Sequence, residues 1–219
     1  MKAVIFDWDG TLADTFHIAL ASFQKALADY SKDFTEDDLK KGFGGGVKGV
    51  IRLFLDEKGI SHSESDIDAI AQRKTEIQSK MAKDVPILPG VRDLIAELKK
   101  HNCGLALCSS NHAGAIKPVL KHNDIDVFGV MVTADNFHGK LKPEPDMFLE
   151  TAKKMSVSPA ECYVFEDSPM GVRAGKDAEM HVIAVETGPF SKQDLEAEGP
   201  NVIFPSLEKT VNITDYIFS

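Results

Sequence analysis

Ala3-Val4-Ile5-Phe6-Asp7-Trp8-Asp9-Gly10-Thr11 is the stretch of sequence that decides the fold. It begins as a short apolar run and ends in two acids that one residue separates. Such a run, bounded by a turn, is typical of a buried strand in a parallel sheet, and α/β proteins bind ligands at the carboxyl ends of these strands. Two carboxylates this close repel each other unless a cation or a proton offsets their charge. We therefore predict a functional site at Asp7 and Asp9, although Asp is also common as a turn residue after strands.

Five more short runs of this kind follow along the chain, and helical patterns separate them. One pattern places Val91, Leu94, Ile95 and Leu98 on a single helix face. Strands that alternate with helices form parallel pairs through right-handed crossovers, so the predicted fold class is α/β with a doubly wound parallel sheet. The further strands are expected at 104–108, 130–132, 162–165, 182–185 and 202–204.

One long interval breaks this alternation. Between the first strand and the second, only helical stripes occur, and Thr15 is suited to cap the first of these helices. We expect residues 16–87 to form a small α-helical domain, inserted into an α/β core domain of residues 1–15 and 88–219. The proline-rich segment 85–90 is the expected hinge between them.

Bulk composition narrows the class of protein. The net charge of −9 over 219 residues argues against nucleic acid or an anionic membrane as a partner, because both favour a basic surface. Three cysteines without a CxxC spacing predict buried free thiols in a reducing compartment. The first apolar run is too short for a signal peptide, and no stretch has the length of a membrane span. We expect a cytoplasmic protein; composition leaves the oligomeric state open and is compatible with a monomer.

Three other segments carry groups that fit chemistry at the same edge of the sheet. Ser109-Ser110-Asn111 ends the second predicted strand, where hydroxyl and N–H groups can hold phosphate oxygens or simply cap a helix. Lys142 precedes Pro143, which restricts the backbone of Lys142 to extended geometry, so this lysine could be aimed at the acids and at phosphate. The competing interpretation is an exposed lysine in a loop. Glu166 and Asp167 end another strand and suit Mg²⁺, a cation that prefers oxygen ligands, although Asp167 or Ser168 also suits the cap of the helix that follows. Together the four segments predict one site rather than four caps.

In these four motifs and across nearly its full length, the chain resembles the haloacid dehalogenase superfamily of phosphohydrolases. The resemblance implies a Rossmann-like core, and the helical insertion after the first motif resembles the α-helical cap of the subgroup with phosphoglycolate phosphatases and β-phosphoglucomutases. It also implies Mg²⁺ as cofactor and a small phosphorylated metabolite as substrate. A carboxylate that attacks phosphorus divides a difficult hydrolysis into two displacements.

The resemblance further implies a role for each motif residue. Asp7 is the expected nucleophile, Asp9 the general acid and base, and Lys142 the group that steadies both the nucleophile and the phosphoryl oxygens. Asp7, Asp9 through its carbonyl, and Asp167 are the expected Mg²⁺ ligands, with Glu166 in or just outside the coordination sphere. The residues expected to bind phosphate or substrate are Thr11, Ser109, Ser110 and Asn111.

The acceptor of the phosphoryl group is the open question. The mutase branch carries a cap histidine ten residues after the second acid, where this chain has Ala19, while the nearby His17 is out of register. This departure favours a phosphatase, with a β-phosphoglucomutase-like mutase or a non-catalytic phosphometabolite-binding protein as alternatives. In the cap, Lys48 and Arg52 follow the glycine-rich segment 42–46 and are candidates for reading an anionic group of the substrate; a glycine linker with two solvated cations is the competing interpretation.

Overall fold

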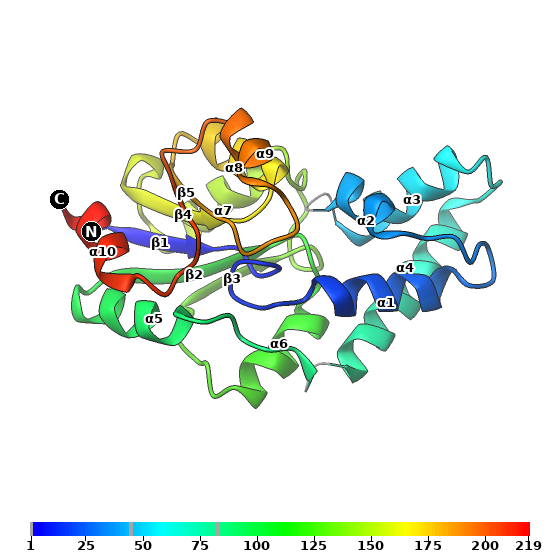
Figure 1. Cartoon of the computed structure of the whole chain (residues 1–219), viewed down its shortest axis with the longest axis horizontal. Coiled ribbons are helices and arrows are strands. Elements are labelled where there is room, and N and C mark those ends of the chain that lie inside the picture. Colours follow the sequence, from blue (N-terminus) through cyan, green and yellow to red (C-terminus); the bar gives the residue numbers. More distant parts are fainter. Residues whose placement is uncertain (1, 44–45, 82–83) are drawn as a thin grey trace.

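The computed structural model describes residues 2–43, 46–81 and 84–219. Its centre is a parallel sheet of six strands in the order β3-β2-β1-β4-β5-β6, which confirms the predicted fold class (Figure 1). Because β1 lies between β2 and β4, the ends of these three strands bring distant sequence segments side by side. The strands are β1 (Ala3–Phe6), β2 (Gly104–Ser109), β3 (Val130–Thr133), β4 (Cys162–Glu166), β5 (His181–Val185) and β6 (Val202–Phe204).

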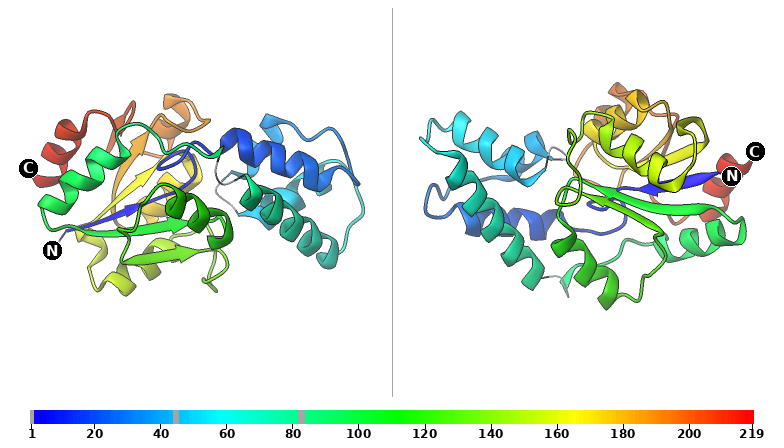
Figure 2. Two further views of the ribbon diagram at one scale, coloured as in Figure 1. Left: turned by 90° about the horizontal axis from the view of Figure 1, so that it is seen from below. Right: turned by 180° about the vertical axis from the view of Figure 1, so that it is seen from behind.

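Helices cover both faces of this sheet, because alternate residues of a strand point to opposite sides. Figure 2 shows this arrangement of helices on the two sides. Val4 and Phe6 of β1 belong to one buried cluster, while Ala3 and Ile5 belong to the other. The first cluster includes residues of α5 (Val91–Lys100), α6 (Ala113–His122) and α10 (Thr210–Phe218). The second includes residues of α7 (Asp146–Met155), α8 (Pro169–Asp177) and α9 (Lys192–Ala197).

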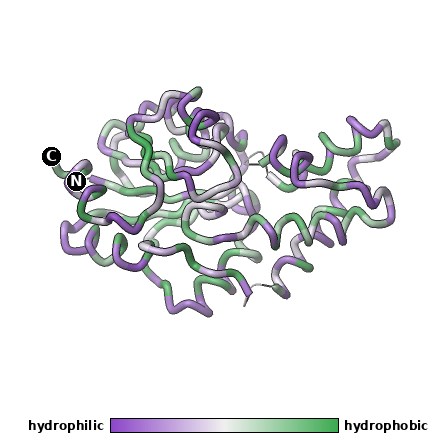
Figure 3. Tube along the Cα trace, in the orientation of Figure 1, coloured by the Kyte–Doolittle hydropathy of each residue, from purple (hydrophilic) through white to green (hydrophobic). Residues whose placement is uncertain are grey.

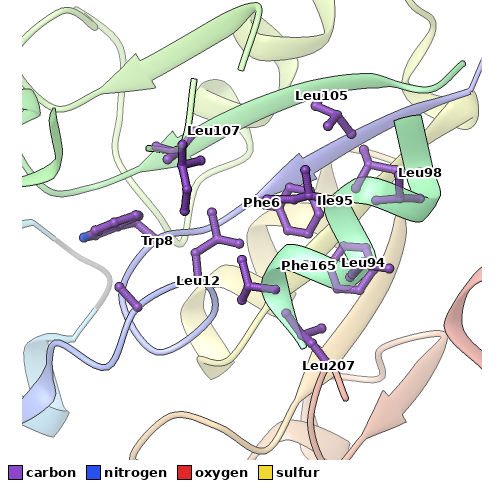
Figure 4. Packing of buried hydrophobic residues seen from close by; sticks show 14 of the residues in the cluster. Phe6, Trp8, Leu12, Leu94, Ile95, Leu98, Leu105, Leu107, Phe165 and Leu207 are labelled. Carbon is purple, nitrogen blue, oxygen red and sulfur yellow. The ribbon is translucent and has the colours of Figure 1, made fainter. Parts of the chain in front are cut away.

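The first buried cluster fixes the loop that leaves β1. Phe6 stacks on Phe165 of β4 with ring centroids 4.9 Å apart, and Trp8 and Leu12 extend the same packing beyond the end of the strand (Figure 4). Burying a side chain of this size stabilises a fold by about 1.5–3 kcal/mol. The apolar packing of Trp8 and Leu12 therefore anchors the turn that carries Asp7 and Asp9.

The described residues of the insertion after β1 form four α-helices with a separate apolar core. They lie beyond the carboxyl ends of the strands (Figure 1), and Phe23, Phe34 and Phe54 pack together among them. The helix α2 is not predicted from the sequence, because a helix of seven residues is too short for a clear periodic pattern. These helices, which we call the cap, are α1 (Phe16–Leu27), α2 (Glu36–Gly42), α3 (Val47–Glu57) and α4 (Glu64–Lys80).

Two chain segments connect the core to the cap, and they run side by side. Leu88 N donates to Leu12 O at 3.0 Å, and Asp14 N donates to Pro86 O at 3.0 Å. The cap helices alternate hydrophilic and hydrophobic positions along the trace (Figure 3), and none of the helices in the described ranges has the length and apolar character that a membrane span requires. We keep residues 16 and 87 as the proposed boundaries of the cap domain.

Candidate active site

The sheet brings the motif residues of β1 and β4 together at its carboxyl edge. Asp7 N donates to Phe165 O at 3.0 Å, so the pairing of the two strands continues one residue past the end of β1. Asp7 from one strand and Glu166 and Asp167 from the other consequently emerge side by side. One carboxylate oxygen from each of these three residues lies within 4.8 Å of the corresponding oxygens of the other two.

Lys142 reaches this acidic group from the loop before α7. Its Nζ lies 2.5 Å from Asp7 Oδ1 and 2.5 Å from Glu166 Oε1, and it also donates to Cys108 O at 3.2 Å. Burial alone would lower the pKa of Lys142, which is only 2% exposed, but the neighbouring carboxylates outweigh burial and hold the pKa above its ordinary value. Lys142 is therefore a fixed positive charge against Asp7.

One lysine does not balance three buried acids. Burial raises the pKa of Asp7 well above its ordinary value, and Glu166 adds to this effect against the attraction of Lys142. Burial also raises the pKa of Asp167, and the negative charges of Glu166 and Asp7 raise it further. With all three acids ionised, the group would carry a net charge of about −2, the amount that one divalent cation neutralises.

Asp167 also offers an oxygen that nothing else in the described chain uses. Its Oδ1 accepts from Thr11 Oγ1 at 3.3 Å, whereas its buried Oδ2 has no hydrogen-bond partner. A buried polar atom without a partner is costly, and a metal ion removes that cost. The donor set, oxygen atoms from carboxylates, fits Mg²⁺.

Two glycines allow the chain to pass this close to Asp167. A Cβ on Gly10, which has φ of +74°, would lie 2.1 Å from Asp167 Oδ2. A Cβ on Gly188, in the loop after β5, would lie 1.8 Å from the same oxygen. Both distances are far inside van der Waals contact, so no side chain fits at either position. The loops after β1 and β5 thus enclose the carboxylate without blocking it.

Asp9 is held separately from the other acids and faces the cap. Thr15 Oγ1 donates to Asp9 Oδ1 at 2.7 Å, and Asn111 Nδ2 lies 3.4 Å from both carboxylate oxygens. Thr15 does occupy the position before α1, but its side chain makes no capping hydrogen bond, which corrects the expectation that it caps this helix. Its hydroxyl orients Asp9 instead.

Glu166 has little freedom in this arrangement. While Oε1 meets Lys142, Oε2 accepts from Ser168 Oγ at 3.0 Å and from the Asp167 and Ser168 N–H groups. Ser168 also caps α8 by accepting from Gly171 N at 3.1 Å. The segment 166–168 therefore both caps α8 and contributes acids to the candidate site.

A cavity of about 60 Å³ lies between the acidic group and the cap. Its core side is charged and its cap side is mostly apolar. The core residues that line it include Asp7, Asp9, Ser110, Asn111, Lys142 and Glu166, and the cap residues include Ala19, Phe23, Phe43, Val47, Val50 and Lys74.

The other predicted site residues lie outside this lining. Ser109 is buried beneath it and accepts from Asn111 N at 3.0 Å, and Thr11 is buried against Asp167. Lys48 and Arg52 are half-exposed on the cap surface, in ion pairs with Asp68 at 2.6 Å and Glu64 at 2.8 Å. The structure does not bring these two cations to the cavity. Of the predicted glycine-rich segment, residues 44 and 45 lie outside the described residues.

Lys74 is the cavity residue that the sequence analysis missed. A signal for it exists: Lys74 follows Ile70 by four residues and Ile67 by seven, so it stands on the apolar stripe of its own helix. A lysine in that position is unusual, because buried charges need partners. Its neighbours on α4 are otherwise polar, which makes the stripe hard to recognise.

Comparison with known proteins agrees with this geometry. Residues 4–185 match the family model described as "Haloacid dehalogenase-like hydrolase". The chain is 34% identical over 202 residues to "(DL)-glycerol-3-phosphatase 1, mitochondrial" of Arabidopsis thaliana, covering 86% of this chain and 65% of that protein. It spans 49% and 19% of the length of two further Arabidopsis relatives.

Relatives of similar length include both a phosphatase and a mutase. "Phosphorylated carbohydrates phosphatase" of Thermotoga maritima is 31% identical over 180 residues, which cover 81% of this chain and 82% of that protein. The crystal structure of β-phosphoglucomutase from Clostridium difficile superposes with a TM-score of 0.88 at 25% identity, covering 99% of this chain and 97% of that one.

Proposed function

The chain belongs to the haloacid dehalogenase-like hydrolases, and from this membership we propose that it is a phosphomonoesterase that requires Mg²⁺ and hydrolyses a small phosphorylated metabolite. The observation that carries the proposal is the contact of Asp7 with Lys142 at 2.5 Å, beside an acidic group that opens into a cavity. This arrangement offers a buried carboxylate held in one orientation, which is what an attack on phosphorus needs.

In the proposed reaction, Asp7 is the nucleophile and carries the phosphoryl group between two displacements. Its second oxygen, Oδ2, would attack while Oδ1 is held by Lys142. The Lys142 ammonium also offsets charge on the phosphoryl oxygens, which is the main contribution of a protein to phosphoryl transfer. We assign Ser109, Ser110 and Asn111, at the end of β2, to the surroundings of the phosphoryl group.

Asp9 is the proposed general acid and base. Thr15 and Asn111 hold its carboxylate toward the cavity, where it can give a proton to the leaving oxygen and later take one from water. A positioned acid or base of this kind contributes about 10²–10⁴-fold to the rate. Removing the orienting donors should therefore reduce the rate without emptying the site.

The carboxylates of Asp7 and Asp167 would hold Mg²⁺, together with the Asp9 carbonyl, and Glu166 would lie in or next to its coordination sphere. The unpartnered Asp167 Oδ2 and the uncompensated charge of the acidic group support this assignment. When bound, Mg²⁺ supplies positive charge that stabilises the phosphoryl oxygens. The three free cysteines support a reducing compartment, for which we propose the cytoplasm.

Water is the proposed acceptor of the phosphoryl group. Ala19 lines the cavity on the cap side, and no histidine of the described residues does so. The cavity thus lacks the imidazole that the mutase interpretation requires at this position. The substrate that we propose is a small phosphate ester, in line with relatives that are named as phosphatases of glycerol 3-phosphate and of phosphorylated carbohydrates.

Phosphate release from a panel of esters tests the proposal. The panel contains phosphoglycolate, glycerol phosphates, hexose phosphates and nucleotides, each with Mg²⁺ and with EDTA, for the native protein and Asp7→Asn. We expect release that needs Mg²⁺ and that the substitution abolishes. Interconversion of hexose phosphates without release would establish the mutase instead. Binding of phosphate esters without any turnover would establish a binding protein.

A further inference from the structure

Lys74 is a buried lysine for which the proposed reaction has no use. It lies on α4, its side chain is 2% exposed, and it is the one cation that the described cap residues contribute to the cavity. Its Nζ donates to Gln78 Oε1, one turn further along the helix, and lies 4.8 Å from the centroid of the Phe23 ring. These two contacts hold the ammonium group of Lys74 in one orientation.

No acid of the described residues forms an ion pair with Lys74. Burial lowers its pKa to about 8, and the opposing attraction comes from Asp9, across the cavity. An ammonium group has three N–H donors, and Gln78 uses one of them. Removing a cation from water is costly unless hydrogen bonds and opposite charge replace the water. The cavity side of Lys74 is therefore a site that an oxygen-bearing ligand would complete.

The residues around Lys74 indicate which part of a substrate would carry the oxygen that binds it. Phe43, Val47 and Val50 form the neighbouring cap wall and offer no polar side chain. Asp7 and Lys142 lie on the opposite, core side, where the phosphoryl group is proposed to bind. A substrate that spans the cavity consequently places its leaving group, not its phosphate, against the cap. Lys48 and Arg52 are occupied by surface ion pairs and do not compete for it.

We propose that Lys74 determines substrate specificity by donating a hydrogen bond to an oxygen of the leaving group, so that the enzyme selects small phosphate esters whose leaving group carries a hydroxyl or a carboxylate. This inference rests on the proposed function. The apolar wall offers the leaving group no other polar partner, and the ammonium requires an acceptor on it. Simple alkyl esters of phosphate would contact the apolar wall but would offer Lys74 no acceptor beyond Gln78.

The test compares three esters that share a phosphate and differ in the leaving group: ethyl phosphate, glycerol 3-phosphate and phosphoglycolate. The value of kcat/KM is measured with saturating Mg²⁺ for the native chain, for Lys74→Met and for Lys80→Met. The last variant removes an exposed lysine from the same helix and serves as the matched control. Thermal unfolding of each variant establishes that it is folded, and Lys74→Gln replaces the methionine variant if that one does not fold.

We expect the native protein to prefer glycerol 3-phosphate or phosphoglycolate over ethyl phosphate, and the ester that it prefers tells whether the acceptor is a hydroxyl or a carboxylate. Lys74→Met should lower kcat/KM for the preferred ester by about tenfold or more, the loss typical of a hydrogen bond to a charged group, and leave ethyl phosphate within about twofold. Lys80→Met should change neither value.

Equal losses on all three esters, unchanged values on all three, or no native preference for an oxygen-bearing ester would overturn the inference while the phosphatase stands. Absence of phosphate release by the native protein from every ester, in contrast, would contradict the proposed function itself.

Discussion

Replacing Asp167 with Asn should make the protein more stable in the absence of metal. Asp167 lies with Asp7 and Glu166 in a buried group in which one oxygen of each residue falls within 4.8 Å of the others, and burial together with these neighbours raises the pKa of Asp167. Asn keeps the shape and the polar contacts of the side chain but carries no charge. The substitution thus removes a repulsion that the site maintains for function.

The size of the effect follows from this geometry. Two unit charges no more than 4.8 Å apart repel by at least about 3 kcal/mol at an effective dielectric constant of about 20. A protein of this size shifts its Tm by roughly 2–4 °C for each kcal/mol. Asp167→Asn in EDTA at neutral pH should therefore raise the Tm by about 6–12 °C. Mg²⁺ should stabilise the native chain by about 2.7 kcal/mol at one hundred times its Kd, and the variant hardly at all.

The pH dependence has a definite sign. An acid whose pKa is raised by folding binds more protons in the folded state than in the unfolded state, so its contribution to stability falls as pH rises above the ordinary carboxyl range. In EDTA, the native protein should lose stability between about pH 5 and 7.5, and Asp167→Asn should lose less.

Scanning calorimetry of the native protein and of Asp167→Asn, with EDTA and with Mg²⁺, at about pH 5 and about pH 7.5 measures these differences in Tm. A variant that is less stable than the native chain in EDTA, or that gains as much from Mg²⁺, would refute the reasoning.

Two further substitutions test how the reacting groups are held. Thr15→Val keeps the buried shape of the side chain but removes the hydroxyl that donates to Asp9. The kcat should fall by about tenfold for alkyl phosphates and less for an aryl phosphate, whose leaving group needs no proton. Equal losses on both esters would contradict the role of Thr15 in orienting Asp9. Lys142→Met removes the positive charge that lies against Asp7 and Glu166. Phosphate release should fall by about 10²–10³-fold, and the free energy of unfolding in EDTA should fall by about 3–5 kcal/mol, a loss that Mg²⁺ partly restores. Near-native activity of this variant would contradict the proposed role of Lys142.

The sheet and its reactive edge were predictable because both follow from local patterns. The apolar run before Asp7 and the one before Glu166 read as strands on their own, and parallel pairing then forces their carboxyl ends to the same edge. The loop position of Lys142 was predictable from its own sequence, whereas its contact with Asp7 was expected only from the family resemblance, because this contact depends on the fold as a whole.

The cap was harder to interpret, because a helical pattern does not tell which face meets the core. Lys48 and Arg52 stand beside a glycine-rich loop, yet α3 turns both toward α4 residues at the surface. Lys74 stands in a helix of mostly polar residues, and only its packing against Phe23 shows that it is buried. Thr15 has the sequence position of a cap, and the competing acceptor, Asp9, comes from the turn that precedes it.

Capture of the phosphoryl group on Asp7 tests the central claim most directly. Asp9→Asn removes the proposed base, so an aryl phosphate, whose leaving group departs without a proton, should still phosphorylate the variant, while hydrolysis of the intermediate becomes slow. Rapid mixing with Mg²⁺ should give a burst of one phenolate per active site. Mass spectrometry after acid quenching should find one added phosphoryl group on the peptide that contains Asp7. A variant that releases phenolate without a burst, and whose Asp7 peptide stays unmodified throughout, would contradict the mechanism.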